Sequence, residues 1–141
     1  MVAVKFKYDM QTLQWMNLFE KVTKAKLRDI IVEGEKVFFV VERGQLRKAL
    51  GPDKKHVKRL EELLDKRVKI IQYTENVHQF IINVLSPLKV VDLKEEDGIV
   101  TIKGPDQKTR GLMIGSRAAN LRLYERIVQK YFPDIKELKV I

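Results

Sequence analysis

The chain has 141 residues, of which 45 % are apolar and 33 % charged, and it carries a formal charge of +9 and no cysteine. This length and apolar content suit one domain or two small ones with a hydrophobic core, and they exclude wholesale disorder. The lack of cysteine excludes disulfide bonds, thiolate metal sites and a cysteine nucleophile.

The chain begins MVAVKFKYDM, in which apolar and basic residues alternate without the apolar stretch of a signal peptide. We therefore expect this segment to be part of the mature protein and the protein to be cytoplasmic. The longest apolar run in the chain is the five residues 37–41, whereas a membrane helix needs roughly 20. We expect no membrane helix and no membrane partner.

From about residue 9, apolar periodicity and turn residues predict helix, strand, strand, short helix, glycine loop, helix and strand. The expected ranges are 11–24, 27–33, 36–42, 44–50, 51–54, 55–65 and 67–73. The first helix has apolar residues at the spacing i, i+3, i+4, i+7, which is typical of a helix with one buried face. They are Trp15, Leu18, Phe19 and Val22. Phe38 and Phe39 point to opposite faces of their strand, so we expect one of them to lie outside this domain's own core.

From about residue 75 the same order of elements recurs. The expected ranges are 76–85, 88–95, 98–103, 107–114, 115–118, 119–131 and 135–141. Pro87 ends the first of these helices, because proline cannot continue a helix. The pattern predicts an α+β (mixed α/β) protein of two domains, residues 1–74 and 75–141, each with a three-stranded sheet packed against helices.

The two halves are related by an internal repeat with an offset of 64 residues. Gly51 aligns with Gly115, so that LRKALGPDKKHVKRLEELL lies over RGLMIGSRAANLRLYERIV. Gly34 aligns with Gly98; each follows an acid and lies between two β-rich runs, which is typical of a hairpin turn. The sequence therefore indicates a duplicated unit.

The excess positive charge is concentrated around the two aligned glycines. Residues 43–59 hold seven basic residues against one acid, residues 106–122 hold four against one, and the rest of the chain holds 17 of each. Basic residues often coat solvated helix faces, but here they follow the repeat, which favours a polyanion as partner.

In each half a short helix ends at a glycine, and a longer helix begins about four residues later. The first turn of the longer helix has backbone N–H groups without helical partners, which suit a phosphate group. Glycine permits a positive φ and leaves room for a ligand, although a glycine that merely ends a helix is also common.

The segment GLMIGSRAANLRLYERIVQKYF, residues 111–132, and the order of elements in each half resemble the type II K-homology (KH) domain. Two such domains in tandem resemble the archaeal NusA family of transcription factors, and the resemblance covers nearly the whole chain. It implies that a GxxG loop clamps about four nucleotides of single-stranded RNA by their backbone, while the bases lie on an apolar groove beside a sheet edge.

The KH pattern places the two loops at residues 51–54 and 115–118, and we expect the closer contact at the second loop. The RNA-binding residues expected in the second half are Arg110, Gly115, Ser116, Arg117, Ala118, Asn120 and Arg122. Those expected in the first half are Arg47, Lys48, Gly51, Lys54, Lys55 and Lys58. Six apolar residues are candidates for the groove, although an ordinary core explains most of them more simply. They are Leu50, Val57, Ile70, Ile114, Leu121 and Leu138.

Both loops lack the second glycine of the GxxG pattern. In the first loop, Pro52 has no N–H, Asp53 brings a like charge towards a phosphate, and Lys54 carries a side chain where the family has glycine. We therefore expect the first loop to lose its tight clamp, while the surrounding cations keep their long-range attraction. Ala118 is a milder replacement in the second loop.

No catalytic pattern is visible in the sequence. The two histidines lie 22 residues apart without carboxylates at metal-ligand spacing, and neither serine lies in a GxSxG turn. We expect no enzymatic activity, no metal and no cofactor.

The first hypothesis is a monomeric, single-stranded RNA-binding factor of transcription elongation, termination or antitermination, with RNA polymerase as a further partner. Its transcriptional role rests on the resemblance alone. The alternative is a protein-interaction scaffold of the transcription or ribosomal machinery whose altered loops no longer clamp RNA.

Overall fold

The structure is a computed structural model that describes residues 4–5 and 8–141. The alternating segment at the start of the chain falls partly outside these described residues. The chain divides into two compact units, residues 1–74 and 75–141. Within the described residues, no helix is long and apolar enough to cross a membrane.

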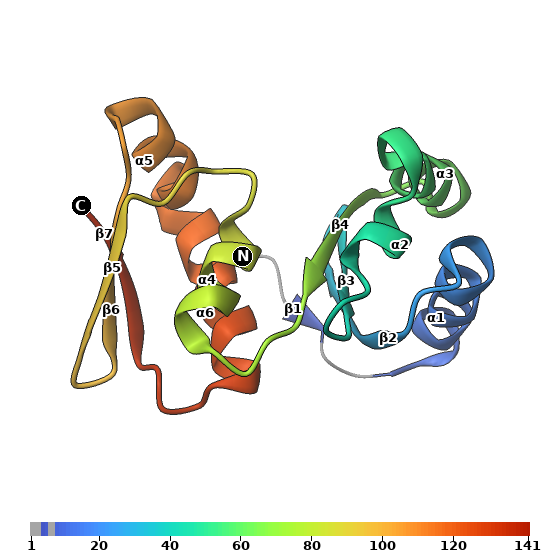
Figure 1. The fold of residues 1–141 in the computed structure, drawn as a ribbon, viewed down its shortest axis with the longest axis horizontal. Helices are drawn as coiled ribbons and strands as arrows, with labels where there is room; N and C mark the ends of the chain where they lie inside the picture. The colour runs from blue at the N-terminus through green and yellow to red at the C-terminus, as the bar shows by residue number, and fades with distance from the viewer. Residues whose placement is uncertain (1–3, 6–7) are drawn as a thin grey trace. The chain divides into compact units, whose positions relative to one another are not determined.

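The first unit packs three helices on one face of a sheet (Figure 1). In chain order its elements are β1 (Val4–Lys5), α1 (Met10–Thr23), β2 (Leu27–Glu33), β3 (Lys36–Val41), α2 (Leu46–Leu50), the 3₁₀ turn η1 (Pro52–Lys54), α3 (Lys55–Leu64) and β4 (Arg67–Gln72). The strand order is β1-β2-β3-β4, in which β3 and β4 are parallel and the other pairs antiparallel. Besides the three expected strands, this sheet therefore has a fourth, the two-residue β1.

The core of the first unit lies between α1 and the sheet. Phe19 is fully buried and stacks on Phe39, with the ring centroids 4.5 Å apart. Trp15 is partly buried and packs against the same cluster, so the predicted apolar face of the first helix is confirmed. Phe38, on the other face of β3, is also only 3 % exposed, so neither phenylalanine of this strand faces solvent.

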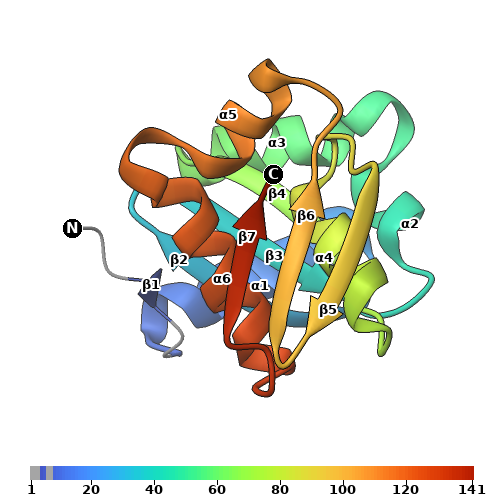
Figure 2. The same ribbon diagram turned by 90° about the vertical axis from the view of Figure 1, so that its left-hand side faces the viewer.

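Apart from β1, the second unit has the same order of elements. They are α4 (Val77–Leu85), β5 (Asp92–Glu96), β6 (Ile99–Lys103), α5 (Gln107–Ile114), the 3₁₀ turn η2 (Ser116–Ala118), α6 (Ala119–Tyr131) and β7 (Glu137–Val140). The strand order is β5-β6-β7, with β6 and β7 parallel. Figure 2 looks onto the face of this sheet that points away from its helices. Lys94, Glu96 and Lys139 are exposed and lie on this face, because they alternate with Glu95, the partner of buried Val100, and with buried Leu138.

Most predicted elements agree with the structure to within two residues. The strand predicted from residue 88 is wrong at its start: the Leu88 N–H donates to Leu85 O in a turn after α4, and β5 begins at Asp92. Both aligned glycines lie in two-residue hairpin turns, Gly34 with a φ of 55° and Gly98 with a φ of 81°. The turns occupy residues 34–35 and 97–98, so the repeat slips by one residue at the hairpin.

Candidate nucleic-acid interface

The two glycine loops have the same backbone conformation. Gly51 and Gly115 follow α2 and α5 with φ of 72° and 74° and ψ of 173° and 177°. Two residues later, Asp53 and Arg117 are left-handed, with φ of 52° and 55° and ψ of 32° and 34°. The repeat found in the sequence is therefore also a repeat of loop geometry.

The fourth position of each loop has a glycine-like conformation without being glycine. Lys54 and Ala118 stand there, with φ of 57° and 61°. For a residue with a side chain, the left-handed conformation is roughly 1–2 kcal/mol less stable than the right-handed one. The replacement of the second glycine therefore strains each loop, yet both loops follow the same course.

The loops differ in their backbone donors. In both, the N–H of the fourth residue donates to the carbonyl oxygen of the first over 3.2 Å. The N–H groups of Ser116 and Arg117 take no part in this loop-closing bond. In the first loop the position of Ser116 is held by Pro52, which has no N–H. The second loop therefore has one more backbone donor than the first.

A side chain from the first turn of the following helix spans each loop. His56 Nδ1 lies 3.1 Å from Lys48 O and 3.2 Å from Ala49 O, and Asn120 Nδ2 donates to Leu112 O over 2.9 Å. These acceptors belong to the last turn of the preceding helix, where carbonyl groups lack helical partners. Asn120, one of the expected RNA-binding residues, thus donates from its amide nitrogen to the protein.

The cations expected in the first half lie exposed on α2, the loop and α3. They are Arg47, Lys48, Lys54, Lys55 and Lys58. Within the described part of the chain, none of them forms an ion pair with an acid. Their charge is therefore not neutralised locally, which suits long-range attraction of a polyanion.

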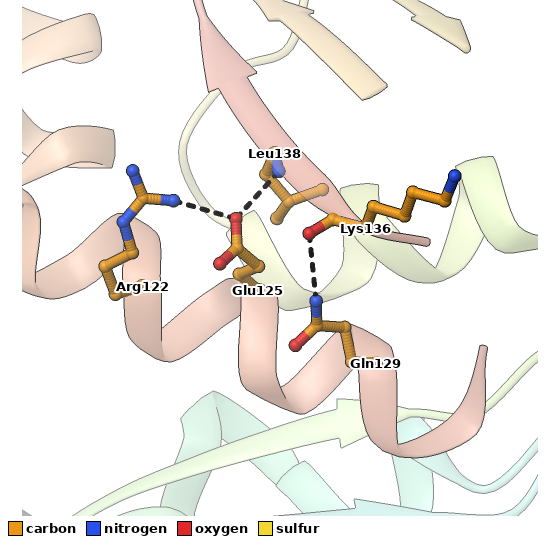
Figure 3. Close-up of polar contacts among 5 residues, drawn as sticks. All are labelled: Arg122, Glu125, Gln129, Lys136 and Leu138. Atoms are coloured by element: carbon orange, nitrogen blue, oxygen red, sulfur yellow. Dashed lines mark hydrogen bonds and ion pairs between the residues drawn. The ribbon is translucent and has the colours of Figure 1, made fainter. Parts of the chain in front are cut away.

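The three arginines expected in the second half differ in their surroundings. Arg117 is exposed and has no ion pair with any described residue, and Arg110 is half-buried. Arg122 instead bonds Glu125, with Nη1 to Oε2 at 2.9 Å, and the same oxygen accepts the Leu138 N–H over 2.9 Å (Figure 3). Arg117 is therefore the least constrained of the three cations.

The contact between Glu125 and Leu138 also has a counterpart in the first unit. Glu61 Oε2 accepts the Val68 N–H over 3.0 Å. Glu61 and Glu125 align in the repeat, and β4 and β7 are edge strands of their sheets. Each glutamate therefore satisfies an N–H of an edge strand and ties the strand to the helix after the loop. Sequence reasoning missed this contact, although the aligned glutamates were a signal for it.

Three of the six apolar residues expected to line a groove are core residues. They are Ile70, Leu121 and Leu138, with 8 %, 6 % and 1 % of their surface exposed. The other three, Leu50, Val57 and Ile114, are only partly buried. Leu50 and Ile114 directly precede the loop glycines, so each loop has a partly exposed apolar side chain beside it.

The described residues contain no candidate metal site. Among the described residues, no three His, Asp or Glu side chains come together as metal ligands.

The pKa of Asp106, which caps α5, is lowered chiefly because the Thr109 N–H donates to its carboxylate. A shallow depression of about 440 Å³ contains no loop residue and is lined by Glu35, Glu61, Asp65, Lys66 and Arg67.

The fold and the loops define the class of the protein. Each unit runs helix, strand, strand, helix, glycine loop, helix and strand, with the last strand parallel to the one before it in chain order. The chain therefore has an α+β fold of two units that is consistent with tandem type II KH domains, and the predicted fold class is confirmed.

Comparison with known proteins identifies the family. No protein-family model matches the chain. It is 32 % identical over 130 residues to the probable transcription termination protein NusA of Halococcus morrhuae, covering 91 % of this chain and 93 % of that protein. It is 27 % identical over 141 residues to the protein of the same name from Methanococcus vannielii, covering 98 % and 81 %. The chain belongs to the archaeal NusA family, as the resemblance predicted.

A solved structure shares the fold. The crystal structure of APE1850 matches 95 % of this chain, and all of its own, with a TM-score of 0.72 and 21 % sequence identity.

Proposed function

We propose that this protein is a non-enzymatic transcription factor that binds single-stranded RNA through its two glycine loops. The observation that carries the proposal is the pair of loops with one backbone conformation. Exposed cations surround the first loop and the exposed Arg117 lies in the second, and none of these cations forms an ion pair with a described acid. The transcriptional role is drawn from the relatives, which are named probable transcription termination proteins. A role in elongation, termination or antitermination, contact with RNA polymerase, and action as a cytoplasmic monomer belong to the same proposal.

The two loops contribute differently in this proposal. The second loop makes the closer contact, because the N–H groups of Ser116 and Arg117 and the Arg117 side chain can all face a phosphate. The first loop, with Pro52 in place of a donor, contributes mainly the charge of its surrounding cations. Two weak sites on one chain raise the overall affinity through effective concentration.

Fluorescence anisotropy with single-stranded RNA, single-stranded DNA and duplex RNA, at about 50 and 200 mM salt, tests the proposal. Single-stranded RNA should bind more tightly than duplex RNA and with a steep salt dependence. Arg117→Glu should weaken binding about tenfold or more. Lys139→Glu makes the same charge change on the exposed face of the second sheet and should weaken binding less than about threefold.

Two results would contradict the proposal. One is the absence of RNA binding at the lower salt concentration, which would favour the protein-interaction scaffold. The other is an equal loss in the Arg117→Glu and Lys139→Glu variants, which would show that RNA is attracted by net charge and not held at the loop.

A further inference from the structure

His56 and Asn120 occupy equivalent positions, five residues after the first glycine of their loops. The carbonyl groups that they reach are equivalent as well, because Lys48 O and Leu112 O are also 64 residues apart. Both neighbours of His56 Nδ1 are acceptors, so this nitrogen carries the hydrogen and donates it. Two different side chains therefore make equivalent contacts: each donates a hydrogen bond that ties its loop to the preceding helix.

Each of these side chains also fills the space above the loop glycine. A Cβ atom placed on Gly51 would lie 2.8 Å from His56 Nδ1, and one on Gly115 would lie 2.7 Å from Asn120 Cγ. Such distances are far shorter than ordinary contacts between heavy atoms. The first glycine of each loop is thus required by the bracing side chain as well as by its positive φ.

The brace spans the loop residues that are conformationally strained. Asp53 and Lys54 in the first loop, and Arg117 and Ala118 in the second, are consecutive left-handed residues with side chains. Without a constraint, such residues return to more populated regions of φ and ψ, and the loop changes its shape. A side chain fixed at both ends of the loop opposes this relaxation.

We propose that His56 and Asn120 are positioning residues, which hold the two loops in the conformation that receives RNA phosphates and do not themselves recognise RNA. This inference rests on the proposed function for its RNA part, whereas the bracing itself is a property of the free protein. It replaces the sequence-based expectation that Asn120 contacts RNA. Its effect on affinity is preorganisation: a loop that is already ordered loses less conformational freedom on binding.

Three variants of Asn120 separate bracing from contact. Asn120→Asp keeps the size of the side chain but removes the donor to Leu112 O, and Asn120→Ala removes the brace entirely. Asn120→His introduces the side chain that performs this contact in the first unit. NMR of the free protein measures the loop directly, because a positive φ gives a strong intraresidue contact between Hα and the amide hydrogen. The residues observed are Arg117 and Ala118.

The expected result is that Asn120→Asp and Asn120→Ala weaken this NMR signal at both residues and reduce the affinity for single-stranded RNA about tenfold. Asn120→His should restore the signal and the affinity. In parallel, His56→Asn should leave the first loop intact, whereas His56→Ala should not. Thermal unfolding of each variant checks that it remains folded.

An unchanged loop signal in Asn120→Asp and Asn120→Ala would overturn the bracing. A restored loop with affinity still reduced in Asn120→His would overturn the positioning role, because the amide itself would then contact RNA. If the wild-type protein binds no RNA, the proposed function fails, while the NMR comparison still decides whether the side chain braces the loop.

Discussion

The left-handed conformation of Ala118 leads to a test with an internal control. Ala118 has a φ of 61° and a ψ of 22°, whereas its neighbour Ala119 has a φ of −60° and a ψ of −43°. Ala118→Gly and Ala119→Gly are therefore the same chemical change on adjacent residues of opposite conformation. We expect the two changes to alter the stability of the second unit in opposite directions.

The magnitudes follow from the backbone angles. Glycine at position 118 removes a strain of roughly 1–2 kcal/mol. It also adds freedom to the unfolded chain, which costs about 0.4–1 kcal/mol. The net result is a stabilisation of about 0.5–1 kcal/mol. Ala119→Gly removes no strain and adds the same freedom to the unfolded chain, so it costs about 0.4–1 kcal/mol.

Thermal unfolding followed by circular dichroism measures both changes. For a unit of this size, 1 kcal/mol shifts the melting temperature by roughly 4–8 °C. We expect Ala118→Gly to melt above the wild type and Ala119→Gly below it. If both variants melted below the wild type by the same amount, Ala118 would not be left-handed, and the shared geometry of the two loops would be refuted.

Other predictions concern charge and the sheet edge. Burial and, secondarily, Lys36 lower the pKa of Lys69 to about 8, so stability should rise between pH 8 and 10.5, where the unfolded chain still binds the proton. Lys69→Met should abolish this rise, as urea titrations at several pH values between 7 and 10.5 would show. Glu125→Ala should cost about 1–2 kcal/mol by leaving the Leu138 N–H without its acceptor, and Glu125→Gln, which keeps an oxygen there, should cost less in the same assay. Lys54→Gly should stabilise the first unit by about 0.5–1 kcal/mol for the reason given for Ala118, yet weaken RNA binding through the lost charge.

The repeat explains how much of the fold could be predicted. Apolar spacing on α1 and the aligned glycines placed the elements of both units, because these local signals agree with the tertiary packing. Residues 88–91, LKVV, resembled the start of a strand. Pairing begins only at Asp92, opposite the last residue of β6, Lys103, and local sequence does not reveal where the partner strand ends. The two-residue β1 has too little sequence to signal a strand, and it exists only through its pairing with β2.

The candidate site could be located from the sequence but not described in detail. Charge and glycine spacing identified residues 51–54 and 115–118, since both are properties of sequence position. The direction of a side chain depends on contacts several residues away, so the sequence did not reveal that the Asn120 amide nitrogen bonds Leu112 O. The departures from GxxG predicted a weaker clamp in the first loop, but they did not reveal that Lys54 and Ala118 both adopt a positive φ.

We propose that RNA lies on the glycine loops, and an NMR titration can locate it residue by residue. Single-stranded RNA is added to isotope-labelled protein, and the amide resonances of both units are followed. The account predicts the largest changes at residues 115–118, smaller ones at residues 51–54, and little change at Lys94 and Lys139 on the exposed sheet face. Changes concentrated on that sheet face, or an RNA complex that leaves residues 115–118 unaffected, would contradict it.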